Sequence, residues 1–171
     1  MKIITSTLVL LLTAAAPLVA QSPERSVIAE LPQGRLVLER SIIPDGIAFN
    51  DRITIEQGSE AVDVFESEGR AIQQVVAEDL DGDGVSELLV QMDLGGSGGF
   101  REFELLQFKE GVYLPVWLDT GYAAGEASIS DRDGSGQKRV YIEYTDTDAE
   151  PQVEATAVFE FTGGTLQRLQ K

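Results

Sequence analysis

The 171-residue sequence contains neither cysteine nor histidine. Without cysteine the chain cannot form disulfides, and without both residue types it lacks the side chains that usually hold zinc. The absence of histidine also removes the general base on which most serine hydrolases depend. Neither a zinc site nor histidine-dependent serine chemistry is therefore expected.

Two short motifs would otherwise suggest a serine enzyme. Residues 95–99 read G-x-S-x-G, but the strand-like run at 100–108 follows where a nucleophile elbow needs a helix. Residues 135–138 read S-x-x-K and lie in a polar loop between two strand-like runs. Both stretches are better interpreted as loops between strands, and no catalytic residue is predicted.

Basic residues are scarce, with 13 Lys and Arg against 29 Asp and Glu, which gives a net charge of −16. Such a field repels nucleic acid and anionic membranes. It attracts cations and basic proteins. A nucleic-acid partner is therefore not expected, and a protein or glycan partner is.

Long apolar runs are absent except at the N-terminus. Met1-Lys2 precedes an uncharged, mostly apolar stretch, and Ala20 ends a segment typical of a secretory signal peptide. The apolar stretch is shorter than the roughly 20 residues that cross a bilayer, so cleavage after Ala20 is favoured over a retained anchor. The sequence thus predicts a signal peptide at 1–20, a single β domain at 21–171, and a periplasmic or extracellular location without a membrane span.

Helical periodicity is missing from the rest of the chain, and apolar residues alternate with polar ones instead. Gly58, Gly111 and Gly164 each separate two strand-like runs and lie 53 residues apart. Blade-like repeats of short strands are predicted near 35–65, 71–118 and 127–169, with strands at 112–118 and 127–130 treated as separate. A period near 50 is typical of propeller blades, but closed propellers need about four to eight of them. The expected fold is all-β, with antiparallel four-stranded meanders stacked as an open propeller-like array; a β-sandwich or a small barrel is the alternative.

Carboxylates are concentrated in one loop, EDLDGDGVSELLV, which starts at residue 78. Calcium takes six to eight oxygen ligands, and compact acidic loops supply them. The predicted ligands occupy positions one, three, five, seven and nine of the loop: Asp79, Asp81, Asp83, Val85 through its backbone carbonyl, and Glu87. Gly82 and Gly84 permit the positive φ angles of an ion-wrapping turn. The alternative is an Asp-Gly-rich turn without an ion, but the like charges would then repel one another.

A second loop repeats the pattern 52 residues later, with Asp131, Asp133, Ser135 and Gln137 as weaker candidate ligands. Position nine of this loop is Arg139, and Arg132 and Lys138 lie nearby. Because three positive side chains can neutralise two carboxylates, a metal-free, ion-paired turn is predicted here.

The first loop, set between strands and ending in ELLV, resembles the FG-GAP repeat. This is the calcium-loop blade of integrin alpha-subunit propellers, and the related VCBS repeats occur in bacterial exported proteins. With the surrounding strands the resemblance covers roughly 100 residues, and it implies the same calcium ligands as above. The chain departs from the family in having Glu87 where aspartate is usual and too few repeats to close a ring.

The function expected from these features is non-enzymatic. We expect an exported, calcium-binding β-repeat domain that engages a partner, for example a basic protein such as a cell-wall lysin. Two alternatives stay open: a carboxylate-dependent hydrolase acting on polysaccharide, and a structural component of the envelope.

Overall fold

The computed structural model describes residues 23–40 and 50–169, so the predicted signal peptide at 1–20 lies outside the described residues. The described chain is built from strands and turns, which confirms the all-β prediction. Within these ranges no helix has the length and apolar character needed to cross a membrane.

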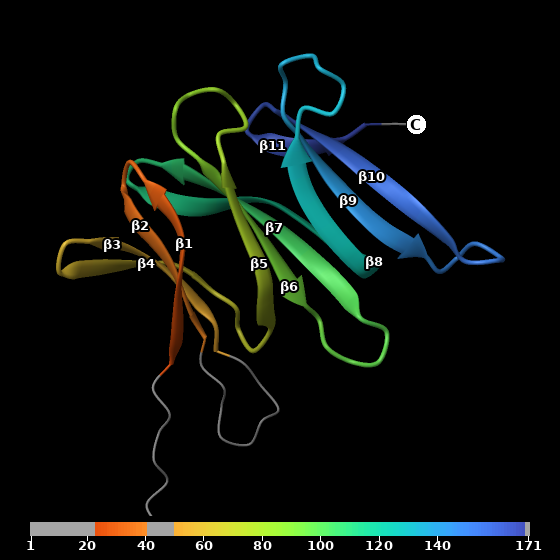
Figure 1. Cartoon of the computed structure of the whole chain (residues 1–171), viewed down its shortest axis with the longest axis horizontal. Helices are drawn as coiled ribbons and strands as arrows, with labels where there is room; N and C mark the ends of the chain where they lie inside the picture. Colours follow the sequence, from red (N-terminus) through yellow and green to blue (C-terminus); the bar gives the residue numbers. More distant parts are fainter. Residues whose placement is uncertain (1–22, 41–49, 170–171) are drawn as a thin grey trace, which may run out of the picture.

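Within the described residues, eleven strands form two antiparallel sheets, and inside each sheet every strand pairs with the strands next to it in sequence (Figure 1). The strands are β1 (Glu24–Leu31), β2 (Gly34–Arg40), β3 (Arg52–Gln57), β4 (Glu60–Glu66), β5 (Ala71–Glu78), β6 (Glu87–Asp93), β7 (Phe100–Lys109), β8 (Val112–Ser130), β9 (Arg139–Asp146), β10 (Val153–Thr162) and β11 (Thr165–Arg168). β1–β4 form the small sheet, and β5–β11 form the large sheet in the order β11-β10-β9-β8-β7-β6-β5. The described strands do not close into a barrel, so an open or sandwich-like arrangement of meanders is what the chain adopts.

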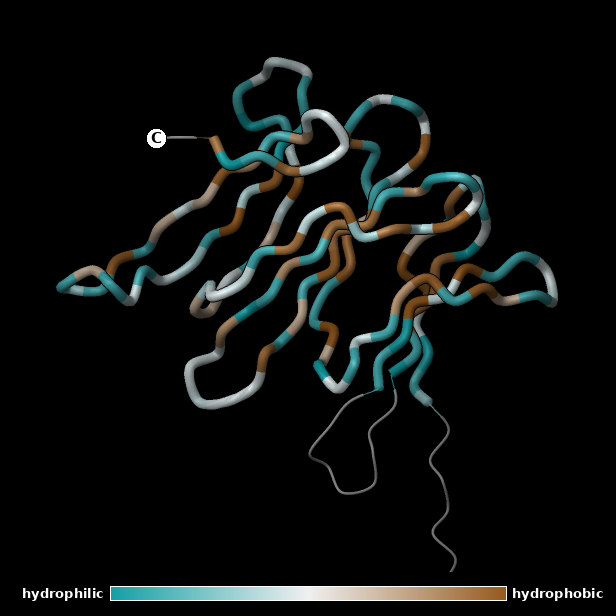
Figure 2. The backbone as a smooth tube through the Cα atoms, turned by 180° about the vertical axis from the view of Figure 1, so that it is seen from behind, coloured by the Kyte–Doolittle hydropathy of each residue, from teal (hydrophilic) through white to brown (hydrophobic). Residues whose placement is uncertain are grey.

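The small sheet packs against the β5–β7 part of the large sheet. Alternation along each strand supplies the contact, because every second side chain points to the same face. The shared cluster combines apolar residues of β2 and β3 with residues of β5, β6, β7 and β8: Leu36, Leu38, Ile53, Ile55, Ile72, Val75, Leu88, Val90, Met92, Leu106 and Tyr113. In Figure 2 the hairpin ends are mostly teal or white while brown segments run through the strands, as this burial requires.

A second apolar cluster fills the other face of the large sheet. It contains the intervening residues of β6 and β7 together with residues of β8–β11, among them Leu89, Phe103, Leu105, Tyr122, Ile142, Phe159 and Phe161. Leu80 of the β5–β6 loop belongs to this cluster and is only 7% exposed. The acidic loop is therefore anchored to the core through an apolar side chain.

Strand β8 corrects one expectation from the sequence. The runs at 112–118 and 127–130, predicted as separate strands, are parts of one strand of 19 residues. Gly121 and Ala124 take positive φ angles of 94° and 50°, and the register with β9 shifts between Ala123 and Glu126. This irregular segment allows β8 to pair with β7 at its first end and with β9 at its second, so the second and third repeats share one sheet. Strand β1 was also missed, although it completes a four-stranded first unit.

Candidate metal centre

The acidic loop connects the two strands at one edge of the large sheet. β5 and β6 pair up to Glu78 and Glu87, which lie opposite each other. The eight loop residues between them must therefore return the chain across a single strand spacing. This closure brings the first residues of the loop next to the start of β6.

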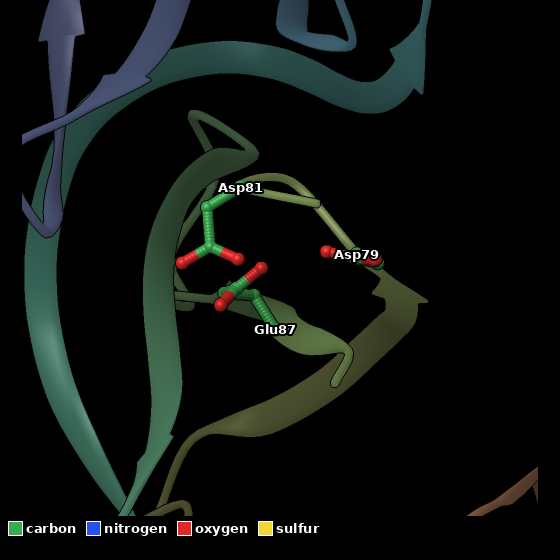
Figure 3. Close-up of side chains that lie close together, drawn as sticks. All are labelled: Asp79, Asp81 and Glu87. Carbon is green, nitrogen blue, oxygen red and sulfur yellow. The ribbon is translucent and has the colours of Figure 1, made fainter. Parts of the chain in front are cut away.

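Three carboxylates converge at this point. Asp79, Asp81 and Glu87 each offer one oxygen, and these three oxygens lie within 4.8 Å of one another. Figure 3 shows the carboxylates of Asp81 and Glu87 facing each other, with Asp79 beside them. Asp81 is exposed, Asp79 half-buried and Glu87 buried. Three negative groups at this separation repel one another, and the cluster could hold a metal ion.

Backbone amides hold the loop in a tight turn. The Asp79 carboxylate accepts hydrogen bonds from the amides of Gly82, at 2.7 Å, and Gly84, at 3.0 Å. Asp81 Oδ1 accepts the amide of Asp83 at 3.1 Å. Gly82 and Gly84 have φ angles of 79° and 86°, which confirms the prediction that these glycines supply left-handed conformations. These amide donors fix the orientations of the Asp79 and Asp81 carboxylates within the loop.

Glu87 is the buried member of the cluster, with only 1% of its surface exposed. Its Oε2 accepts the amide of Leu80 at 2.9 Å, which links the start of the loop to the start of β6. Burial raises the pKa of Glu87, and the nearby charge of Asp81 raises it further. A buried carboxylate is costly to keep charged, so it either holds its proton more tightly or pairs with a cation.

Gln107 of β7 also belongs to the site, and sequence reasoning missed it. Its Nε2 donates to Asp81 Oδ2 at 3.1 Å and to Glu87 Oε1 at 3.4 Å. Leu106 pairs with Leu88 across β6 and β7, which places Gln107 beside Glu87. The sequence contains only an indirect signal for Gln107. If β6 and β7 form a hairpin in this register, the polar side chain at position 107 lies next to the acidic loop.

The remaining predicted ligands of the first loop lie outside the group of three. Asp83 is exposed, and its Oδ1 accepts the amide of Val85 at 2.7 Å. The participation of Asp83 and of the Val85 carbonyl in ion binding stays a prediction.

The second loop has a similar backbone but a different charge environment. Asp131 accepts the amides of Ser135 and Gly136 at 3.0 and 2.7 Å, and the Gly136 bond repeats the Asp79–Gly84 bond. Asp133 pairs with Arg139, and hydrogen bonds from Ser135 and Arg139 hold the pKa of the Asp133 carboxyl well below its usual range. Among the residues that the structure describes, no three carboxylates converge here. That the second loop binds no metal stays a prediction, which the Asp133–Arg139 ion pair supports.

The ion pairs of the second loop differ in part from the prediction. Of the three basic residues of this loop, Arg139 alone pairs with a carboxylate of the loop itself in the part of the chain that the structure describes. Arg132 pairs with Glu143 of β9, and Lys138 pairs with Glu78 of β5. Gln137 donates to Glu160 of β10 at 2.6 Å, so its amide nitrogen is committed outside the loop. The Lys138–Glu78 pair ties the second loop to the strand that leads into the first.

An open cleft of about 640 Å³ separates the two loops. Its walls are formed by both loops and one side chain of β10: Asp79, Leu80, Asp81, Gly82, Ser135, Gly136, Gln137, Lys138 and Phe161. Two of the three clustered residues, Asp79 and Asp81, therefore line this concave surface between the loops.

No family model matches the sequence, and no curated protein matches it. The similarity of the acidic loop to FG-GAP and VCBS repeats accordingly stays a prediction based on the residues quoted above.

Proposed function

We propose that this protein is an exported, non-enzymatic β domain that binds calcium at the β5–β6 loop and engages a basic protein with the loop end of its large sheet. The observation that carries the calcium part is the convergence of Asp79, Asp81 and Glu87 oxygens within 4.8 Å. Calcium suits such a set because it accepts carboxylate oxygens in flexible geometry, whereas magnesium demands a near-ideal octahedron and retains waters.

The role of the ion is structural in this proposal. Extracellular calcium modules bind with dissociation constants of about 0.1 to 1 mM. An ion that binds only the folded state adds about 1.4 kcal/mol at ten times its dissociation constant. For a domain of this size that raises the melting temperature by about 3 to 6 °C.

The experiment is a calcium titration followed by calorimetry and thermal unfolding. Asp81→Asn removes one charge from an exposed member of the cluster, so the protein should fold while losing most of the calcium-dependent rise in melting temperature. Asp133→Asn is the matched control, since Asp133 occupies the equivalent position 52 residues later. A wild-type protein whose melting temperature ignores millimolar calcium would refute the proposal.

The interaction part is supported by the net charge of −16 and by the cleft between the loops, which Asp79 and Asp81 line. A negative field accelerates encounter with a cationic partner and weakens as salt increases. The export part is supported by the signal-like segment at 1–20. The protein lacks histidine and cysteine altogether, which supports a binding role over the histidine- or cysteine-based chemistry of many hydrolases.

Retention on an immobilised cell-wall lysin tests the interaction. We expect binding at low salt, release at high salt, and weaker retention when Asp79 and Asp81, the two acidic residues that line the cleft, are both replaced by asparagine. Retention that is equal on an acidic control protein, or that ignores salt, would contradict an electrostatic partner surface.

A further inference from the structure

The side-chain amide of Gln107 is satisfied at one end only. Its Nε2 donates to two carboxylates of the cluster, Asp81 and Glu87. Its Oε1 is buried and has no hydrogen-bond partner among residues 23–40 and 50–169, and the residue as a whole is 8% exposed. A buried carbonyl oxygen is normally paired, so this atom calls for a partner that the metal-free arrangement does not supply.

The two ends of the amide are exchanged by rotating the planar group through half a turn. Without an ion, the NH₂ end faces the carboxylates because they accept its hydrogens. With a cation between the carboxylates, the same NH₂ end would be repelled and the carbonyl end attracted. Side-chain amide carbonyls are ordinary calcium ligands.

Resting on the proposed calcium site, we infer that Gln107 turns its carbonyl oxygen toward the ion and serves as a ligand from outside the loop. The ligand set then joins two adjacent strands: Asp79, Asp81 and Glu87 come from the β5–β6 hairpin, and Gln107 comes from β7. Gln107 follows Leu105 and Leu106 on β7, which pack into the two apolar clusters on opposite faces of the large sheet and are 0% and 1% exposed. The ion therefore fixes the acidic loop to the body of the large sheet rather than only closing the loop on itself.

The test compares Gln107→Leu with the wild type in two measurements. Calcium affinity is determined by calorimetry, and the number of bound waters is determined from Eu³⁺ luminescence lifetimes in H₂O and D₂O, with Eu³⁺ as the calcium surrogate. We expect calcium affinity to fall at least about tenfold, the order found when groups supporting a metal are removed. The Eu³⁺ ion should gain one water where the carbonyl was. Gln137→Leu, at the second loop, is the matched control and should change neither quantity.

Gln107→Glu provides an independent arm if the leucine variant fails to fold. The glutamate at position 107 still offers an oxygen to the ion. When no ion is bound, its negative charge repels the three carboxylates of the cluster. This variant should be less stable than the wild type in chelator and should gain more melting temperature from calcium.

The outcomes separate the inference from the proposal beneath it. A wild type that binds neither calcium nor Eu³⁺ overturns the calcium site itself. A wild type that binds, with Gln107→Leu unchanged in affinity and water count, leaves the calcium site standing and overturns the role of Gln107. The role of Gln107 is also overturned if calcium raises the melting temperature of Gln107→Glu by no more than it raises that of the wild type.

Discussion

The carboxylate of Asp51 accepts a hydrogen bond from the backbone amide of Ile72 at 2.9 Å and so joins the small sheet to the large one. Asp51 precedes β3 and is fully buried, whereas Ile72 is the second residue of β5. Arg40 reinforces the junction by donating to the Ile72 carbonyl at 2.6 Å. Ser67 completes it, since its Oγ accepts the Asp51 amide at 3.0 Å. The apolar interface between the sheets is thus closed at one end by a polar bridge.

Replacing Asp51 with alanine should lower the free energy of unfolding by about 2 to 4 kcal/mol, because it leaves the Ile72 amide without its acceptor and removes a partner of Arg40. Urea denaturation measures the change. Glu30→Ala is the control: it breaks the exposed Arg35–Glu30 pair, which should cost less than about 1 kcal/mol. Equal effects for the two variants would show that the bridge does not hold the sheets together.

A second buried amide stabilises the irregular segment of β8. Gln91 of β6 is 6% exposed; its Nε2 donates to the Gly125 carbonyl at 3.2 Å, and its Oε1 accepts the Ala127 amide at 3.3 Å. Gln91→Leu should cost about 1 to 3 kcal/mol, since two backbone groups lose their partner in the interior. Gln74→Leu, at an exposed position of β5, makes the same chemical change without that loss. A Gln91→Leu protein as stable as Gln74→Leu would rule out the bridging role.

The buried carboxylate of Glu87 predicts a pH dependence of the metal-free protein. Burial raises its pKa in the folded state above the usual value of 4.5. The folded state then binds more protons than the unfolded state between these two values, so stability falls as pH rises through that window. In chelator, Glu87→Gln should flatten this fall and be relatively more stable at neutral pH than in acid. Urea midpoints across the acid range check the prediction, and parallel curves for the two proteins would contradict it.

Calcium should reverse the ranking of the same two proteins. An ion among the carboxylates favours the charged form of Glu87, so the wild type should gain more stability from calcium than Glu87→Gln at neutral pH. The thermal-unfolding series that tests Asp81→Asn can include this variant. A larger calcium response in Glu87→Gln would place the ion elsewhere.

Tyr113 predicts a loss of stability in alkali. Its hydroxyl donates to the Ser86 carbonyl at 3.0 Å, and burial, with the charge of Glu87, raises its pKa to about 12. The unfolded side chain titrates near pH 10, so stability should decline as pH rises from about 10 to about 12. Tyr113→Phe should remove part of that decline. The remaining decline in the Tyr113→Phe protein should come from Tyr122, whose pKa is raised by burial and by its hydrogen bond to Asp119. A decline of the same size in both proteins would show that the Tyr113 proton is not involved.

Local patterns in the sequence determined the all-β class, the meander order and the position of the acidic loop. Period-two alternation depends on which residues follow one another, and Asp-Gly turns depend on the conformational freedom of single residues such as Gly82 and Gly84. Both are properties of short stretches, so they can be predicted without knowing what packs against what. The ion pair between Asp133 and Arg139 in the second loop followed in the same way from a basic residue at position nine.

The tertiary structure alone decided how the repeats join and which distant residues complete the site. β8 continues through the segment where two strands were expected, because pairing with β7 on one part and β9 on the other keeps its backbone hydrogen-bonded across the irregular residues. Gln107 reaches the carboxylates, and Gln91 reaches the β8 backbone, only through the register of neighbouring strands. Such contacts join residues 20 and more positions apart. They form only when strand register and sheet packing are fixed together, and no single stretch of sequence determines either one.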